Sequence, residues 1–151
     1  MKKHSLSKPC ATAGLSLIEL SIALAIVGIL AGVAYPSYAR YVVRNSRVAA
    51  QNEVSELSSV QEKIFLNSNA YSGNMNTPYD GTANGGLGKT SGQTGDGKYA
   101  LAVVSTGQSY TITATPAAGT TQASDGSFSI ASTGARTCGT PTPSWCVNNA
   151  W

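Results

Sequence analysis

The stretch Gly14-Leu-Ser-Leu-Ile-Glu-Leu20 begins an apolar run that ends at Ala39, and this run decides the fold. From Leu20 to Ala39 the chain has no charged side chain. About twenty helical residues, at about 1.5 Å each, cover about 30 Å, which is the thickness of a bilayer's hydrocarbon core. The run can therefore span a membrane. Its one carboxylate, Glu19, needs a partner, because an unpaired charge in a membrane costs at least about 2.5–3.5 kcal/mol.

Residues 1–14 form a basic segment ahead of this run, with Lys2, Lys3 and Lys8 as its charged residues. A secretory signal peptide has an apolar run of about 7–15 residues, followed by a small-residue cleavage site. Here the small residue, Gly14, comes before the apolar run, which is also longer. Cleavage after Gly14 would leave the whole apolar run in the mature protein. The positive-inside rule keeps the lysines in the cytoplasm and places the rest of the chain across the membrane.

These residues resemble the type IV pilin family, which includes the pseudopilins of type II secretion. That family has a basic class III leader ending in Gly, an apolar first mature residue and Glu at the fifth mature position. Gly14, Leu15 and Glu19 match these positions, with Leu15 where Phe is usual. The resemblance implies that a prepilin peptidase recognises the basic leader, cuts between Gly14 and Leu15, and methylates the new amine of Leu15. It also implies that Glu19 pairs with the N-terminal ammonium of a neighbouring subunit during assembly.

Gly28, Gly32 and Pro36 interrupt the apolar run. The two glycines, four residues apart, would give a flat face for close approach of another helix. They can equally be the ordinary glycines of a membrane helix. Pro36 lacks a backbone N–H and bends a helix. The family resemblance adds a third interpretation, in which the helix between Gly28 and Pro36 loosens when a subunit leaves the bilayer for the filament.

The rest of the chain predicts an α+β fold. Residues 15–39 form the transmembrane and filament-core helix, and residues 40–66 continue it as an amphipathic helix. The apolar face of the amphipathic part consists of Val43, Ala50, Val54, Leu57, Val60 and Ile64. Residues 67–97, rich in Gly and Asn, predict a long loop to the sheet, with Tyr71 and Tyr79 as contacts to the domain and a flexible turn at 84–88.

Strands are predicted within residues 98–151, at 99–104, 110–115 and 127–131, where β-branched and aromatic residues alternate with polar ones. Three or four short antiparallel strands have one apolar face, which the amphipathic helix can cover. The expected product is a type IV pilin-like lollipop, in which a small antiparallel sheet packs on the second half of a long helix.

Charge gives little support for nucleic-acid binding. Cleavage removes three of the ten basic residues, and the remaining seven equal the seven acidic residues, so the mature chain is neutral. The sequence pI of about 8.8 therefore belongs largely to the leader. On the amphipathic helix, arginines precede glutamates, an order that suits either pairing between staggered subunits or a solvated face. These residues are Arg40, Arg44, Arg47, Glu53, Glu56 and Glu62.

Cys138 and Cys146 are the cysteines that remain after cleavage, because Cys10 lies in the leader. Beyond the membrane they would form a disulfide and close a loop of about nine residues, worth about 2–4 kcal/mol. The resemblance matches this loop to the disulfide-bounded C-terminal loop of pilins, which pseudopilins generally lack. The mature chain has no His and no free Cys, so we expect no metal site, no cofactor and no enzymatic activity.

The run from Tyr110 to Pro116, followed by Asp125 and Gly126, resembles minor pilins. The resemblance therefore implies a minor subunit of a type IV pilus that serves motility, adhesion or DNA uptake. Its expected partners are major and minor pilins, prepilin peptidase, the inner membrane and the pilus assembly platform. The expected location is the inner membrane, with the C-terminal domain in the periplasm, and then the extracellular filament. Two alternatives are a pseudopilin of type II secretion and a tip pilin whose loop binds a ligand or DNA. For the second alternative, Arg136 and Trp145 are the candidate contacts.

Overall fold

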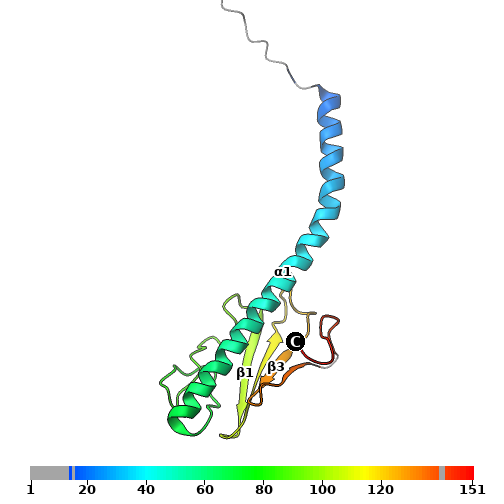
Figure 1. Cartoon of the computed structure of the whole chain (residues 1–151). Coiled ribbons are helices and arrows are strands. Elements are labelled where there is room, and N and C mark those ends of the chain that lie inside the picture. Colours follow the sequence, from blue (N-terminus) through cyan, green and yellow to red (C-terminus); the bar gives the residue numbers. More distant parts are fainter. Residues whose placement is uncertain (1–13, 15, 140–141) are drawn as a thin grey trace, which may run out of the picture. The chain divides into compact units, whose positions relative to one another are not determined.

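The computed structural model describes residue 14 and residues 16–139 and 142–151, which form one long helix followed by a four-stranded sheet (Figure 1). Helix α1 comprises Leu17–Ser68. The strands are β1 (Tyr99–Ser105), β2 (Tyr110–Pro116), β3 (Phe128–Ala131) and β4 (Arg136–Cys138). The chain divides between Ala39 and Arg40 into two compact units. We call the helical residues 17–39 the anchor segment and residues 40–151 the globular unit.

The anchor segment is helical throughout, and every one of its side chains is exposed. Its apolar residues give α1 a stretch with a mean hydropathy of 2.4, which is long and apolar enough to cross a membrane. Pro36 lies inside the helix, which continues past it to Ser68. An exposed helix that is apolar on all sides needs a membrane or other helices around it, because water disfavours such a surface.

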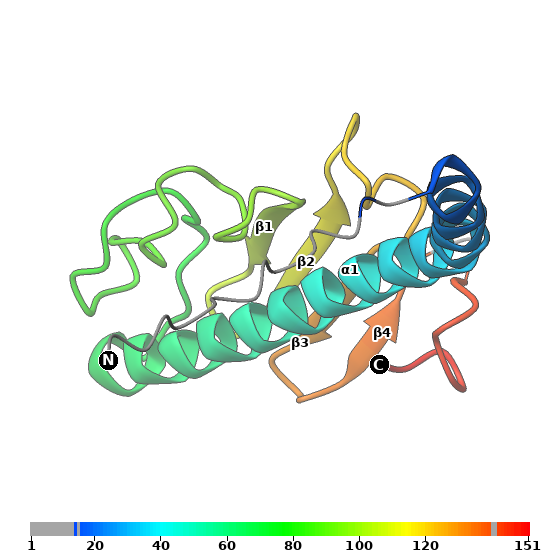
Figure 2. The same cartoon turned by 90° about the horizontal axis from the view of Figure 1, so that it is seen from above.

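In the globular unit, α1 lies along one face of the sheet (Figure 2). The buried apolar residues of this helical part are Ala50, Val54, Leu57 and Ile64, as the helical period predicts. Val43 and Val60, predicted for the same face, are half-buried. Two polar residues, Ser46 and Gln61, also lie on the buried face, which periodicity did not predict. The helix ends at Ser68, two residues beyond the predicted end.

The sheet is an antiparallel meander in the order β1-β2-β3-β4. Alternate residues of the strands face α1, and on the middle strand Ile112 is paired with Val103 and Ile130. The buried residues of this face are Tyr99, Leu101, Tyr110, Ile112, Ala114, Phe128 and Ile130. Burial of each large apolar side chain contributes about 1.5–3 kcal/mol. The α+β class, with a long helix on a small antiparallel sheet, is confirmed.

The segment between α1 and β1 is a loop with a packed interior. Gln61 on α1 forms two hydrogen bonds with the backbone of Ser72, at 2.7 and 3.0 Å. Met75 and Leu87 are buried, and Tyr71 stacks on Phe65 with 4.6 Å between ring centroids. Tyr71 therefore contacts the domain as predicted.

Two features of this loop differ from prediction. Tyr79 is 47% exposed rather than docked on the domain. The turn at 84–88, predicted to be flexible, is packed, because Gly85 and Gly86 are buried. A Cβ at Gly86 would overlap the backbone of Thr77. These two glycines therefore permit a close approach of backbones rather than free movement.

Candidate functional site

The first candidate site is the start of the anchor segment. Glu19 lies in the first turn of α1 and is exposed, and the Ser21 hydroxyl donates to the Leu17 carbonyl at 2.8 Å. A carboxylate at a helix N-terminus is favoured by the helix dipole. Gly14 is described and exposed. Leu15 and the leader residues Lys2, Lys3 and Lys8 lie outside the described residues.

Gly28 and Gly32 leave open space on the anchor segment, since a Cβ at either position would meet no atom within 4 Å. Around them, the anchor presents large apolar side chains that are more than half exposed. These side chains are Leu17, Ile18, Leu20, Ile22, Leu24, Ile26, Val27, Ile29, Leu30 and Val33. Such a surface can bind lipid or the apolar helices of other subunits.

The second candidate region is a buried polar network at the beginning of the globular unit. Arg47 on α1 forms an ion pair with Asp125, whose side chain is 4% exposed while that of Arg47 is 15% exposed. Asp125 also accepts hydrogen bonds from the Tyr99 hydroxyl and from Nε2 of Gln122. Gln122 Nε2 lies 2.9 Å from the Val43 carbonyl oxygen, to which it donates. The network thus joins the loop between β2 and β3 to the first turns of the unit's helix.

This environment changes two pKa values. Burial alone would raise the pKa of the Asp125 carboxyl, but hydrogen bonds from Arg47, Tyr99 and Gln122 outweigh it and hold that pKa below its usual value. Burial, helped by the hydrogen bond to Asp125, raises the pKa of the Tyr99 hydroxyl well above its usual value. Asp125 is therefore charged and Tyr99 neutral near pH 7. Both groups are fully engaged, which suits a structural role.

The C-terminal loop is closed by the disulfide between Cys138 and Cys146, whose Cα atoms are 6.4 Å apart. Trp145 in this loop is half-buried, and its indole N–H donates to the Asp125 carbonyl. The Arg47 guanidinium lies over the Trp145 ring, 4.5 Å from its centroid. The disulfide loop is therefore attached to the same network that joins the β2–β3 loop to α1.

Arg136 and Trp145, predicted together as ligand contacts, have different partners. Arg136 on β4 lies over the ring of Trp151, with 4.6 Å between its Cζ and the ring centroid. Trp151 donates its indole N–H to the Ser129 carbonyl at 2.9 Å and packs against Phe128, with 5.1 Å between centroids. Each tryptophan thus has its own arginine over its ring, and Arg136 and Trp145 belong to two separate pairs.

Other charged residues of α1 are also used within the chain. Glu53 forms an ion pair with Lys89, and Glu62 lies 3.3 Å from the Tyr110 hydroxyl, which donates to it. Arg47 is committed to Asp125. Of the arginine and glutamate series on this helix, Arg47, Glu53 and Glu62 therefore have partners within the chain. Arg44 and Glu56 remain exposed.

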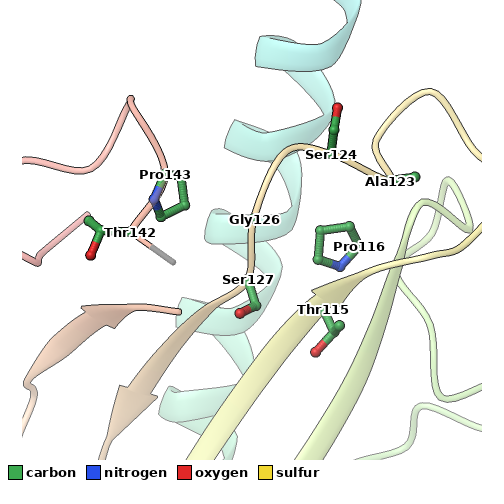
Figure 3. A pocket seen from close by; sticks show the side chains of 8 residues that line it. All are labelled: Thr115, Pro116, Ala123, Ser124, Gly126, Ser127, Thr142 and Pro143. Carbon is green, nitrogen blue, oxygen red and sulfur yellow. The ribbon is translucent and has the colours of Figure 1, made fainter. Parts of the chain in front are cut away.

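A depression of about 380 Å³ lies between the β2–β3 loop and the disulfide loop (Figure 3). Its described lining carries hydroxyls, methyl groups and proline rings and no charge. The lining residues are Thr115, Pro116, Ala123, Ser124, Gly126, Ser127, Thr142 and Pro143. Gly126 has a φ of +93°, and a Cβ there would overlap the Pro143 ring, so glycine is needed for the two loops to meet.

Sequence reasoning missed Asp125, Gln122 and Trp151. Asp125 precedes a glycine and was interpreted only as part of a turn. A buried Gln and a terminal Trp have no periodic pattern that would single them out. Within the described residues, no group of three or more His, Cys, Asp and Glu side chains could hold a metal ion.

A long helix with an exposed apolar first half, followed by an antiparallel sheet and a disulfide loop, defines the chain as a type IV pilin. Residues 11–35 match the prokaryotic N-terminal methylation motif, and residues 36–142 match the family model described as "Type IV minor pilin ComP, DNA uptake sequence receptor". The chain belongs to this family of type IV minor pilins. Proteins of the pilin family are structural subunits rather than enzymes.

The curated relatives match this chain over part of its length. A fimbrial protein of Pseudomonas aeruginosa is 45% identical over 53 residues, which are 35% of this chain and 34% of that protein. The type IV major pilin protein PilA of Myxococcus xanthus (strain DK1622) is 36% identical over 59 residues, 39% of this chain and 27% of that protein. The type IV major fimbrial protein FimA of Dichelobacter nodosus is 38% identical over 53 residues, 35% of this chain and 34% of that protein. The matched part thus spans about a third or less of each of these relatives.

Proposed function

We propose that this protein is a minor structural subunit of a type IV pilus. Prepilin peptidase cuts the precursor between Gly14 and Leu15 and methylates Leu15. The anchor segment holds the subunit in the inner membrane, with the globular unit in the periplasm. The assembly platform then transfers the subunit to an extracellular filament of major and minor pilins.

The observation that carries this proposal is the anchor segment itself, whose apolar side chains are all exposed around a single carboxylate. A helix of this kind is stable in a bilayer or among other apolar helices. Among helices, Glu19 would be buried, and a buried charge without a partner costs several kcal/mol. The N-terminal ammonium of another subunit supplies that partner, so the pair also fixes the axial register of the incoming subunit.

Gly28, Gly32 and Pro36 fit the same role. The open space beside the two glycines allows a neighbouring helix to approach closely. Pro36 removes one hydrogen bond of the helix, which makes bending there less costly. Together these positions let the anchor segment adapt to the curved packing of a filament core.

Quantitative mass spectrometry of sheared filaments tests the proposal. We expect a peptide that begins at methylated Leu15, at a small fraction of the abundance of the main subunit. Glu19→Val should leave the cleaved protein in the membrane and strongly reduce its share in filaments. Glu56→Val, which removes an exposed carboxylate farther along α1, is the matched control and should assemble normally. Normal incorporation of Glu19→Val would refute the pairing, and absence of the wild-type chain from filaments would favour a pseudopilin.

A second function, DNA binding by the globular unit, is supported by the family model, whose description names a DNA uptake sequence receptor. The unit has seven basic residues (ten minus three in the leader) and six acidic residues (seven minus Glu19), so it is almost neutral. Long-range attraction to DNA is therefore weak. Binding to DNA would therefore depend on a few cationic side chains that the fold positions and whose N–H groups can still donate hydrogen bonds.

Fluorescence anisotropy with the full chain in detergent and a labelled DNA duplex tests this second function. We expect saturable binding that weakens as NaCl rises from 50 to 200 mM, as it does when phosphate contacts contribute. Binding no stronger than that of a soluble protein of similar charge would refute it, without affecting the structural role.

A further inference from the structure

We infer that Arg136, whose guanidinium lies over the Trp151 indole, binds a backbone phosphate of duplex DNA; the inference rests on the proposed DNA-binding function. Arg136 is exposed at the edge strand β4. Among the described residues it has no carboxylate partner, and its contact is with the aromatic ring. Its charge is therefore available to an anion from solution.

Most other cations of the globular unit are engaged within the fold. Arg47 is paired with Asp125 and Lys89 with Glu53, and Lys98 donates to the Ser46 hydroxyl at 2.9 Å. Arg40 also has an interaction partner. Arg44 and Lys63 are exposed on α1, and in the described part of the chain neither lies over an aromatic ring.

Trp151 is a rigid platform for Arg136. Its indole N–H donates to the Ser129 carbonyl, and its ring meets Phe128 edge to face at 62°. Phe128 is 1% exposed and belongs to the core of the sheet. Trp151 is thus held by its ring contact with Phe128 and by its N–H, and it offers the guanidinium a fixed surface.

A guanidinium is a planar fork of five N–H donors, and those that do not face the ring can donate to a partner from solution. Two parallel N–H groups match two oxygens of a phosphate, and such charge-assisted pairs are the stronger hydrogen bonds of proteins. The contact with the ring restricts the side chain before binding, so less side-chain entropy is lost when a phosphate binds. Arg136 is thus prepared for an oxyanion in a way that a free surface arginine is not.

One face of each tryptophan ring is occupied by an arginine and is not open for stacking of bases. The Trp145 ring is covered by Arg47, and the Trp151 ring by Arg136. An unpaired base would have to displace a cation to stack there. The geometry therefore favours contact with the DNA backbone over contact with splayed bases.

Anisotropy titrations of the full chain with two unrelated duplexes of equal length test the inference. We expect Arg136→Gln to weaken binding at least tenfold on both duplexes and to lower the slope of log Kd against log[NaCl] by about one. Arg44→Gln, the matched loss of an exposed arginine, should weaken binding less than threefold. Arg136→Lys keeps the charge but loses the planar fork, and it should weaken binding at least threefold.

A second variant tests the platform. Trp151→Leu keeps Arg136 and an apolar contact for Phe128. It should weaken DNA binding as much as Arg136→Lys does. An unchanged far-ultraviolet circular dichroism spectrum would show that the variant is folded. If wild type binds DNA and Arg136→Gln behaves like Arg44→Gln, the inference is wrong while the DNA-binding function stands. A loss on one duplex only would indicate a base contact and overturn the phosphate assignment. A wild-type chain that does not bind DNA would overturn both.

Discussion

Replacing Asp125 by Asn should strongly destabilise the globular unit. The substitution keeps the shape of the side chain but removes the charge that compensates Arg47. Because the Arg47 side chain is only 15% exposed, its guanidinium would be left largely away from water without a counter-charge. Removing one partner of a buried ion pair costs about 3–5 kcal/mol. A domain of this size has a total stability of about 5–15 kcal/mol.

Urea unfolding of a fragment comprising residues 40–151 measures this cost. The fragment contains every residue described as buried, from Ser46 to Ile130, so its core is complete. We expect the free energy of unfolding to fall by about 3 kcal/mol or more, and Tm to fall by about 12–20 °C at about 4 °C per kcal/mol.

The double variant Arg47→Met/Asp125→Asn supplies the control. Removal of both charges leaves neither one uncompensated, so the double variant should lose less than the sum of the two single losses by at least about 1 kcal/mol. A loss below about 1 kcal/mol for Asp125→Asn, or strict additivity in the double variant, would refute the assignment of this pair as a buried, coupled one.

The same network sets the pH range of stability. The folded pKa of Asp125 lies below the unfolded value of about 3.9, so its contribution is complete above about pH 4 and is lost as pH falls further. The pKa of Tyr99 is raised above the unfolded value of about 10, so its contribution is complete below about pH 10 and is lost as pH rises further. Asp125→Asn should flatten the acid limb and Tyr99→Phe the alkaline limb of a plot of unfolding free energy against pH.

Three further predictions concern the unit's packing. Replacing both Cys138 and Cys146 by Ser should lower the free energy of unfolding, measured in urea, by about 2–4 kcal/mol. It should also shift the fluorescence of Trp145 to longer wavelength. An unshifted spectrum would show that the disulfide does not position Trp145. Gln61→Leu should lower the free energy of unfolding by about 1–3 kcal/mol, because it leaves the backbone N–H and carbonyl of Ser72 without their hydrogen-bond partner. Gln51→Leu, at a half-buried position of α1, is the control. Gly86→Ala should destabilise the unit because its Cβ would overlap Thr77. Gly95→Ala should leave stability nearly unchanged, because a Cβ there meets no atom within 4 Å. Equal effects of the two substitutions on stability would contradict a packed turn at 84–88.

Local patterns predicted the regular elements well. Helical period and alternation depend on residues a few positions apart, and they located the buried positions Ala50, Val54 and Leu57 on α1 and Ile112 on β2. The strand β4, only three residues long, has no alternation of its own and is formed by pairing with β3. The position of β4 could therefore not be predicted from the pattern of neighbouring residues.

Long-range polar contacts were beyond sequence reasoning. Arg47 and Asp125 are 78 residues apart, and nothing in their neighbours indicates that they meet. Arg136 and Trp145 were predicted together as ligand contacts, but the sequence did not indicate that Arg136 would lie over Trp151. Trp151 takes that place because the end of the chain returns to β3, where its indole reaches Ser129.

The contacts of Gln122 and Asp125 with α1 join the β2–β3 loop to the helix, and we call these contacts the clamp. The clamp has a mechanical consequence. When α1 is pulled from its N-terminal side, the tension reaches the globular unit at Arg40. The first contacts to bear it are the hydrogen bond from Gln122 to Val43 and the ion pair between Asp125 and Arg47. These bonds cross from the helix to a different segment of chain, so tension along the helix shears them rather than peeling them one at a time. Rupture under tension should therefore begin at this clamp, while the sheet beyond it stays folded.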